Sequence, residues 1–111
     1  MAESVLINAA TVEAAASSAV VAFAAAEDEY VDFRVSCDQA HSVAFYVADA
    51  TFSAITSASK IFTPWYPGLA STSGTTGNIF TVWPGSRSYV ACVVTNNGSS
   101  AATVTVGAEN G

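Results

Sequence analysis

Positive charge is scarce in this chain. Arg34, Lys60 and Arg87 are the only cations among 111 residues, which also carry nine carboxylates, for a net charge of −6. Such a balance repels phosphate backbones and anionic lipid, so we expect no binding to nucleic acid or to a membrane. From residue 61 to residue 108 the only charged side chain is that of Arg87. A surface with so few charges suits a protein contact or a stacking ligand better than it suits a free monomer.

Leucine is almost absent as well, since Leu6 and Leu69 are the only two. Alanine, valine and phenylalanine therefore make up most of the hydrophobic residues, which amount to 51% of the chain and exclude disorder. Valine, threonine and aromatic residues favour pleated strands. We expect a single domain over residues 1–111, long enough to bury a core without a metal ion or a disulfide.

Targeting signals and cysteines are few. No basic residue precedes the apolar stretch at residues 14–26, which is short and interrupted by Ser17 and Ser18. The sequence therefore predicts neither a secretion signal nor a membrane span, and we expect synthesis in a cytoplasm. Without export, Cys37 and Cys92 are expected to be buried free thiols, with a disulfide across the fold as the alternative.

Alternating hydrophobic residues predict two β-hairpins. Residues 89–95 and 102–106 flank Asn96-Asn97-Gly98-Ser99-Ser100, whose residues favour a tight turn. We expect this closing hairpin to place Val90, Cys92 and Val94 in the core. Residues 30–37 and 42–48 show the same alternation around a polar turn and predict a second hairpin. Its inward residues include Val35, Cys37 and Phe45, whereas Tyr30, Asp32 and Arg34 share the polar outer face.

The remaining segments complete a chain of about eight short strands. Residues 9–26 are ambiguous, because their alanines favour a helix whereas Val20 and Val21 favour a strand. We favour two strands there, at residues 10–15 and 19–25. Further strands are expected at residues 3–8, 52–62 with a break near Ser57, and 79–83, with a long loop at residues 63–78. This pattern predicts an all-β fold, a two-sheet antiparallel β-sandwich that is immunoglobulin-like or jelly-roll-like.

Residues that would carry catalysis or bind a metal ion do not form a recognisable set. His41 is the only histidine, and its position predicts a polar turn residue rather than a general base. The acidic run at residues 27–29 lacks the spacing of a calcium loop, and the glycine-rich run at residues 73–77 lacks the lysine of a phosphate loop. We therefore expect no enzyme activity, no metal ion and no cofactor.

Aromatic residues are the strongest candidates for a binding surface. Trp65 and Tyr66 lie in a loop between prolines, and Trp83 ends a predicted strand before Pro84. Three roles remain open: these side chains cap the core, anchor a protein interface, or stack on a sugar.

The chain resembles small virion proteins of tailed phages. The resemblance lies in an Ala/Ser/Thr/Val-rich N-terminal part, a strand of the form YVDFRVSC with a polar turn, an aromatic loop, and an ending of the form SYVACVVTNNGSSAATVTV. The residues that carry it are Phe33, Val35, Tyr89, Val93, Thr95, Asn97, Gly98 and residues 103–106. It implies a capsid decoration or cement protein, which binds the outer shell beside the major capsid protein, often as a trimer, and stabilises capsomer contacts.

The sequence thus predicts a non-enzymatic structural protein on the capsid surface of a virion, assembled in the host cytoplasm. The alternatives are a carbohydrate-binding β-sandwich module and a tail or head–tail structural subunit. The expected interface residues are Trp65, Tyr66, Trp83, Tyr89 and Val93. Because the outer face of residues 89–95 carries no charge, we expect a neighbouring subunit to cover it.

Overall fold

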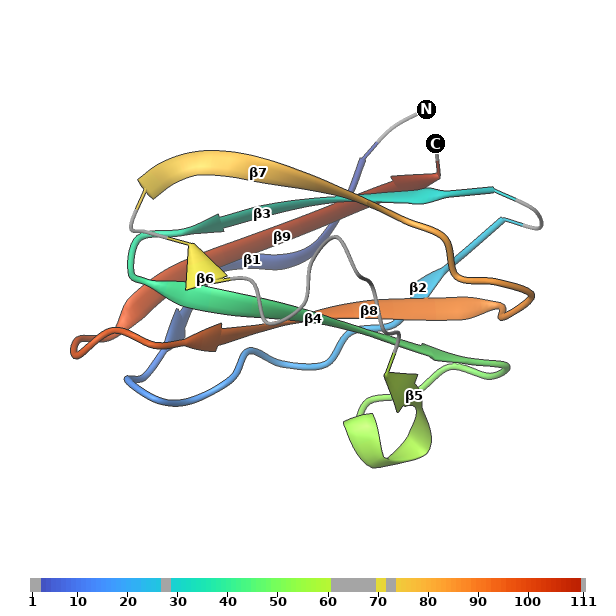
Figure 1. Cartoon of the computed structure of the whole chain (residues 1–111), viewed down its shortest axis with the longest axis horizontal. Helices are drawn as coiled ribbons and strands as arrows, with labels where there is room; N and C mark the ends of the chain where they lie inside the picture. The colour runs from blue at the N-terminus through green and yellow to red at the C-terminus, as the bar shows by residue number, and fades with distance from the viewer. Residues whose placement is uncertain (1–2, 27–28, 61–69, 72–73, 111) are drawn as a thin grey trace.

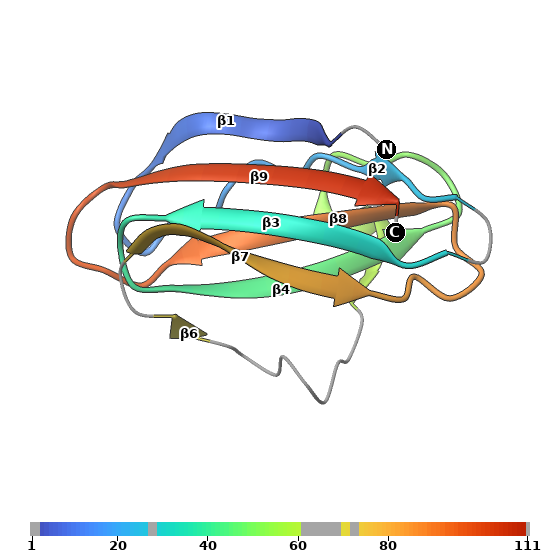
Figure 2. The ribbon, with the colours of Figure 1, turned by 90° about the horizontal axis from the view of Figure 1, so that it is seen from above.

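Two antiparallel β-sheets lie face to face in the computed structural model, which describes residues 3–26, 29–60, 70–71 and 74–110 (Figures 1 and 2). Sheet A has the strand order β1 (Ser4–Val12), β9 (Ala102–Asn110), β3 (Val31–Cys37) and β7 (Gly74–Val82). Sheet B has the order β2 (Phe23–Ala24), β8 (Tyr89–Asn96), β4 (His41–Ala48) and β5 (Ser59–Lys60). A further short strand, β6 (Ala70–Ser71), pairs with the start of β4. The prediction of an all-β, two-sheet sandwich is confirmed.

The strand order is that of a jelly roll. The pairs β1–β9, β2–β8, β3–β7 and β4–β5 are nested, so that the first strand pairs with the last and each following strand pairs one step further in. The contacts β3–β9 and β4–β8 then join these pairs side by side into the two sheets. Folding one such ribbon of nested pairs onto itself gives two four-stranded sheets.

The two predicted hairpins are wrong. Strands β3 and β4 lie in different sheets, as do β8 and β9, so each of these turns carries the chain from one sheet to the other. The alternation identified the buried faces correctly, because the inner residues of both strands face the same core. It did not identify the pairing partner, since a polar turn of a few residues is compatible with either arrangement.

Hydrogen bonds from one side chain and from the backbone hold the two sheet-crossing turns in place at one end of the sandwich. The buried Asn96 side chain donates to the carbonyls of Val12 and Ser100, at 3.0 and 2.8 Å, and accepts from the Gly98 amide at 2.8 Å. The Asn97 amide donates to the Ala40 carbonyl at 2.8 Å, which ties the second turn to the first. The sequence that resembled a hairpin turn therefore closes an end of the core.

The described residues of the alanine-rich N-terminal part contain no helix, in agreement with the preference for strands over a helix. Their strands nevertheless differ from those predicted. One strand, β1, covers residues 4–12 and is bulged near Ala9, whose φ is +48°. The predicted strand at residues 19–25 is reduced to β2, with an isolated bridge from Ser17 to Thr95.

In the middle of the chain, residues 52–60 contain less strand than predicted, whereas residues 70–78 contain more. The predicted loop at residues 63–78 contains β6, and β7 begins at Gly74, so that residues 74–77 of the glycine-rich run are part of a strand. Residues 61–69 and 72–73 lie outside the described residues. The predicted break near Ser57 is a single turn of 3₁₀ helix, η1 (Ile55–Ser57), and only Ser59 and Lys60 after it are paired. Across the ranges described above, no helix is long and apolar enough to cross a membrane.

The core lies between the sheets and centres on three phenylalanines. Phe33 and Phe80 are paired neighbours in sheet A, and the ring of Phe45 from sheet B packs against both, with centroid distances of 5.5 and 5.8 Å. Valines from β3, β4, β8 and β9 fill the space around these rings. Cys37 and Cys92 are buried in the same core as free thiols, so the favoured alternative is the one observed.

We predict that Asn96→Ala destabilises the protein by about 3 kcal/mol, because it removes three hydrogen bonds and leaves buried backbone groups without partners. Urea unfolding followed by circular dichroism measures the loss. The matched control is Asn97→Ala, since the exposed Asn97 uses its backbone amide in the turn contact and should cost less than about 0.5 kcal/mol. Equal losses in the two variants would contradict this account of the turn.

Candidate functional site

The predicted interface residues that the structure describes lie in different sheets, since Trp83 follows β7 of sheet A whereas Tyr89 and Val93 belong to β8 of sheet B. Trp65 and Tyr66 lie outside the described residues. Trp83 is 44% exposed and follows the last residue of β7, whereas Tyr89 is half-buried at the start of β8. Val93 is 6% exposed and so offers little surface to a partner.

A neighbouring subunit is not needed to explain why the outer face of β8 carries no charge. On that face Ala91 is 0% exposed within the single chain, and Val93 is nearly as buried. The segment before β2 pairs with the edge of this strand, where backbone hydrogen bonds join Ser18 to Val94 and Ala16 to Asn96, and the Ser17 hydroxyl is 2.9 Å from that of Thr95. The absence of charge on this face therefore reflects burial inside the chain.

Exposed apolar side chains gather instead on the outer face of sheet A. Five large hydrophobic side chains are exposed among the described residues: Val5, Tyr30, Ile55, Ile79 and Trp83. Val5 and Ile79 lie in strands of sheet A, and Tyr30 and Trp83 lie directly beside strands of that sheet. All four side chains are on the side of sheet A that faces away from the core. We call this surface the sheet A face, and its members are Glu3, Val5, Tyr30, Asp32, Arg34, Ile79, Thr81, Trp83, Gly107 and Glu109.

The strand register arranges these side chains in rows across the sheet. At one end the rings of Tyr30 and Trp83 are neighbours, with centroids 5.1 Å apart and planes tilted by 50°. The next row runs Thr81–Asp32–Glu109 across β7, β3 and β9. The row after it runs Ile79–Arg34–Gly107–Val5 across all four strands. The face thus combines exposed apolar side chains, 53% for Tyr30 and 59% for Ile79, with a central group of charges.

The central charges are partly paired. Arg34 Nε lies 3.3 Å from a carboxylate oxygen of Glu3, and both side chains are well exposed. Gly107 makes room for this contact, because a Cβ at that position would lie 2.6 Å from the Glu3 side chain. The Thr81 hydroxyl donates to Asp32 Oδ1 at 2.7 Å. Because the ion pair is exposed to water, it contributes little to stability.

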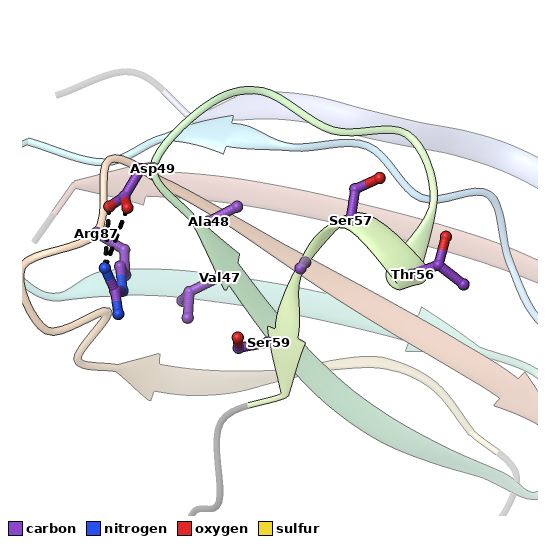
Figure 3. Close-up of a pocket in the computed structure, with 8 residues that line it drawn as sticks. Val47, Ala48, Asp49, Thr56, Ser57, Ser59 and Arg87 are labelled. Carbon is purple, nitrogen blue, oxygen red and sulfur yellow. Dashed lines mark hydrogen bonds and ion pairs between the residues drawn. The ribbon is translucent and has the colours of Figure 1, made fainter.

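A polar pocket of about 390 Å³ opens at the other sheet, between the end of β4, η1, β5 and the turn before β8 (Figure 3). Asp49 and Arg87 form an exposed ion pair at one side of it, with Nη1 at 3.1 and 3.2 Å from the two carboxylate oxygens. Thr56, Ser57 and Ser59 contribute hydroxyl groups to its lining. The described residues of its lining offer hydrogen bonds but include neither a nucleophile–base pair nor an aromatic ring for stacking.

His41 is not the polar turn residue that the sequence predicted. It begins β4 and is buried, and its Nδ1 lies 2.8 Å from the Gln39 carbonyl oxygen, to which it donates. The Cys37 thiol donates to the same oxygen at 3.5 Å. The two side chains therefore share one acceptor at the turn instead of bonding to each other as a nucleophile and its base would. Within the described ranges, no three histidine, cysteine or acidic side chains converge as metal ligands.

Comparison with known proteins adds no identification. No protein-family model matches the chain, and no curated protein is similar to it at a significant level. The sheet A face consequently has to be interpreted from its own residues.

Sequence reasoning found part of this face and missed the rest. Trp83 was predicted, and the alternation of residues 30–37 correctly placed Tyr30, Asp32 and Arg34 on one outer face. The contributions of Ile79 and Val5 were missed, because their exposure depends on which strands are neighbours. The alternation of residues 79–82 could have identified Ile79. Phe80 and Val82 share the core-facing side of the strand, so Ile79 points away from the core.

We predict that the Cys92 thiol makes stability fall at high pH. Burial raises the pKa of this thiol well above its ordinary value of 9.0, so the folded protein keeps the proton that the unfolded chain loses. The contribution of the protonated Cys92 thiol to the free energy of unfolding is complete below about pH 9. Above that pH it decreases by about 1.4 kcal/mol per pH unit. Urea unfolding of the wild type and Cys92→Ala between about pH 8 and about pH 11 measures the difference. A difference in unfolding free energy that stays constant with pH would refute the assignment.

Proposed function

We propose that this protein is a non-enzymatic structural subunit of a virus particle, a decoration or cement protein that binds the outside of the shell through the sheet A face. The observation that carries the proposal is the concentration of exposed apolar side chains on that one face. Monomeric proteins rarely leave such side chains gathered together, and tryptophan, tyrosine and arginine are the residues that most often anchor protein interfaces.

The fold and the charge support the same function by analogy. Jelly rolls are common among viral shell proteins, although the same fold also serves lectins and enzymes. A net charge of −6 keeps such a subunit away from packaged nucleic acid. Weak contacts suffice if several copies act together, and we therefore propose a homo-oligomer, with a trimer as the favoured form, that binds the major capsid protein at several points.

A carbohydrate-binding module is the second candidate, and the Tyr30–Trp83 pair is the observation that favours it. Two half-exposed rings 5.1 Å apart offer apolar surface on which a sugar ring can stack. The charges beside the rings and the apolar Ile79 and Val5 extend the face well beyond what one sugar ring would cover. We therefore favour a protein partner.

The test is co-sedimentation with undecorated shells of the phage whose genome encodes the chain, together with the melting temperature of those shells. We expect the wild type to bind and to raise the melting temperature. Ile79→Ala and Trp83→Ala should each weaken binding by about tenfold to a hundredfold, because they remove apolar anchors from the contact.

Ile55→Ala is the matched control. Ile55 is another large exposed hydrophobic residue, but it lies in η1 and outside the sheet A face. It should leave binding unchanged. Absence of shell binding by the wild type, combined with retention on a polysaccharide resin that Trp83→Ala abolishes, would reject the proposal in favour of the carbohydrate-binding module.

A further inference from the structure

We infer that the sheet A face docks onto a protein surface that presents a lysine or arginine between apolar side chains. The identity of the partner as the viral shell rests on the proposed function. The chemistry of the partner rests on the charges of the face itself, and the two are tested separately below.

The face carries more carboxylates than it can pair. Its charged residues are Glu3, Asp32, Arg34 and Glu109, and the one guanidinium is occupied by Glu3 at 3.3 Å. Asp32 and Glu109 make no ion pair with any residue that the structure describes. They are also directly opposite each other on β3 and β9. Like charges in that position destabilise a sheet, so this pair of carboxylates lowers the stability of the folded chain.

A shallow hollow of about 30 Å³ lies among these groups. Its lining consists of Glu3, Asp32, Arg34, Ile79 and Glu109, which come from four neighbouring segments of the sheet. The volume is about that of one water molecule, so it suits the tip of a side chain rather than a whole ligand. An ammonium group placed there would lie near three carboxylates and one guanidinium, a net charge of −2, and its aliphatic stem would lie along Ile79.

A second copy of this chain does not supply that cation through the same face. A two-fold contact would bring two identical faces together, each with three carboxylates and one guanidinium. Such a contact would place four unpaired carboxylates near one another, and like charges across an interface cost several kcal/mol. The partner is therefore not the same face of a second copy, and we assign it to a different protein.

The deciding variant is the double substitution Asp32→Asn, Glu109→Gln, which removes both charges and preserves shape. The side-chain amide introduced at position 32 keeps an oxygen for the Thr81 hydroxyl, so we expect an equal or higher melting temperature. Shell binding should weaken about tenfold or more. The loss of affinity between about 50 mM and about 300 mM NaCl should also be smaller than in the wild type, because fewer charges are screened.

The matched control is Glu13→Gln, Asp49→Asn, which changes the net charge equally at two exposed positions outside the face. It should bind shells as the wild type does. Wild-type affinity and salt dependence in the double variant at Asp32 and Glu109 would overturn the inference and leave the proposed function standing.

A second experiment tests whether the sheet A face recognises a lysine between apolar side chains, independently of whether the protein binds shells. Titration of the ¹⁵N-labelled protein with the peptide acetyl-Val-Lys-Val-amide at millimolar concentration should shift the amide signals of Asp32, Ile79, Thr81 and Glu109. The same titration with acetyl-Val-Gln-Val-amide, or with the double variant, should not. Localised shifts without shell binding would reject the proposed function and support the inference. Shifts scattered over all carboxylates would overturn the inference whatever the shells show.

Discussion

The packing of Phe45 against Phe33 and Phe80 is the contact on which the two-sheet structure depends. Phe45 comes from sheet B and the other two rings from sheet A, so their contact joins the sheets at the middle of the core. In this topology nearly every turn crosses between the sheets, and few hairpins hold sequence neighbours together within one sheet. The sheets are therefore held face to face by apolar burial, with aromatic rings providing the largest share per residue.

The sequence predicted the layers of this fold but not their connections. Alternation in residues 30–37 and 42–48 correctly identified Val35, Cys37 and Phe45 as buried, because the period of a strand fixes which side chains share a face. Pairing between strands depends on distant residues, such as Ser4 with Ala108 at the two ends of the chain. Local turn chemistry does not encode such a partner, and for this reason both hairpins were predicted in place of sheet-crossing turns.

The same limit explains the outcome at the candidate site. A stretch without charge, such as Tyr89 to Thr95, is compatible both with burial by the chain itself and with burial by a partner, and only the burial of Ala91 and Val93 within the single chain distinguishes them. The exposed face instead combines residues from β1, β3, β7 and β9. Trp83 could be recognised from its type, since a large aromatic residue beside a turn is a candidate anywhere. The cross-strand pairing of Asp32 with Glu109 could not be recognised from the sequence, because it follows from the register of two strands that are separated by most of the sequence.

Nested pairing also governs when the chain can fold during its synthesis. Strand β1 leaves the ribosome first, yet its hydrogen-bonding partner is β9, and β2 and β3 likewise wait for β8 and β7. Closing these long loops costs chain entropy before any ladder forms, which places such folds among the slow folders. The nascent chain therefore carries unpaired, weakly charged strands until β7, β8 and β9 emerge, and this interval is when it is most prone to aggregation.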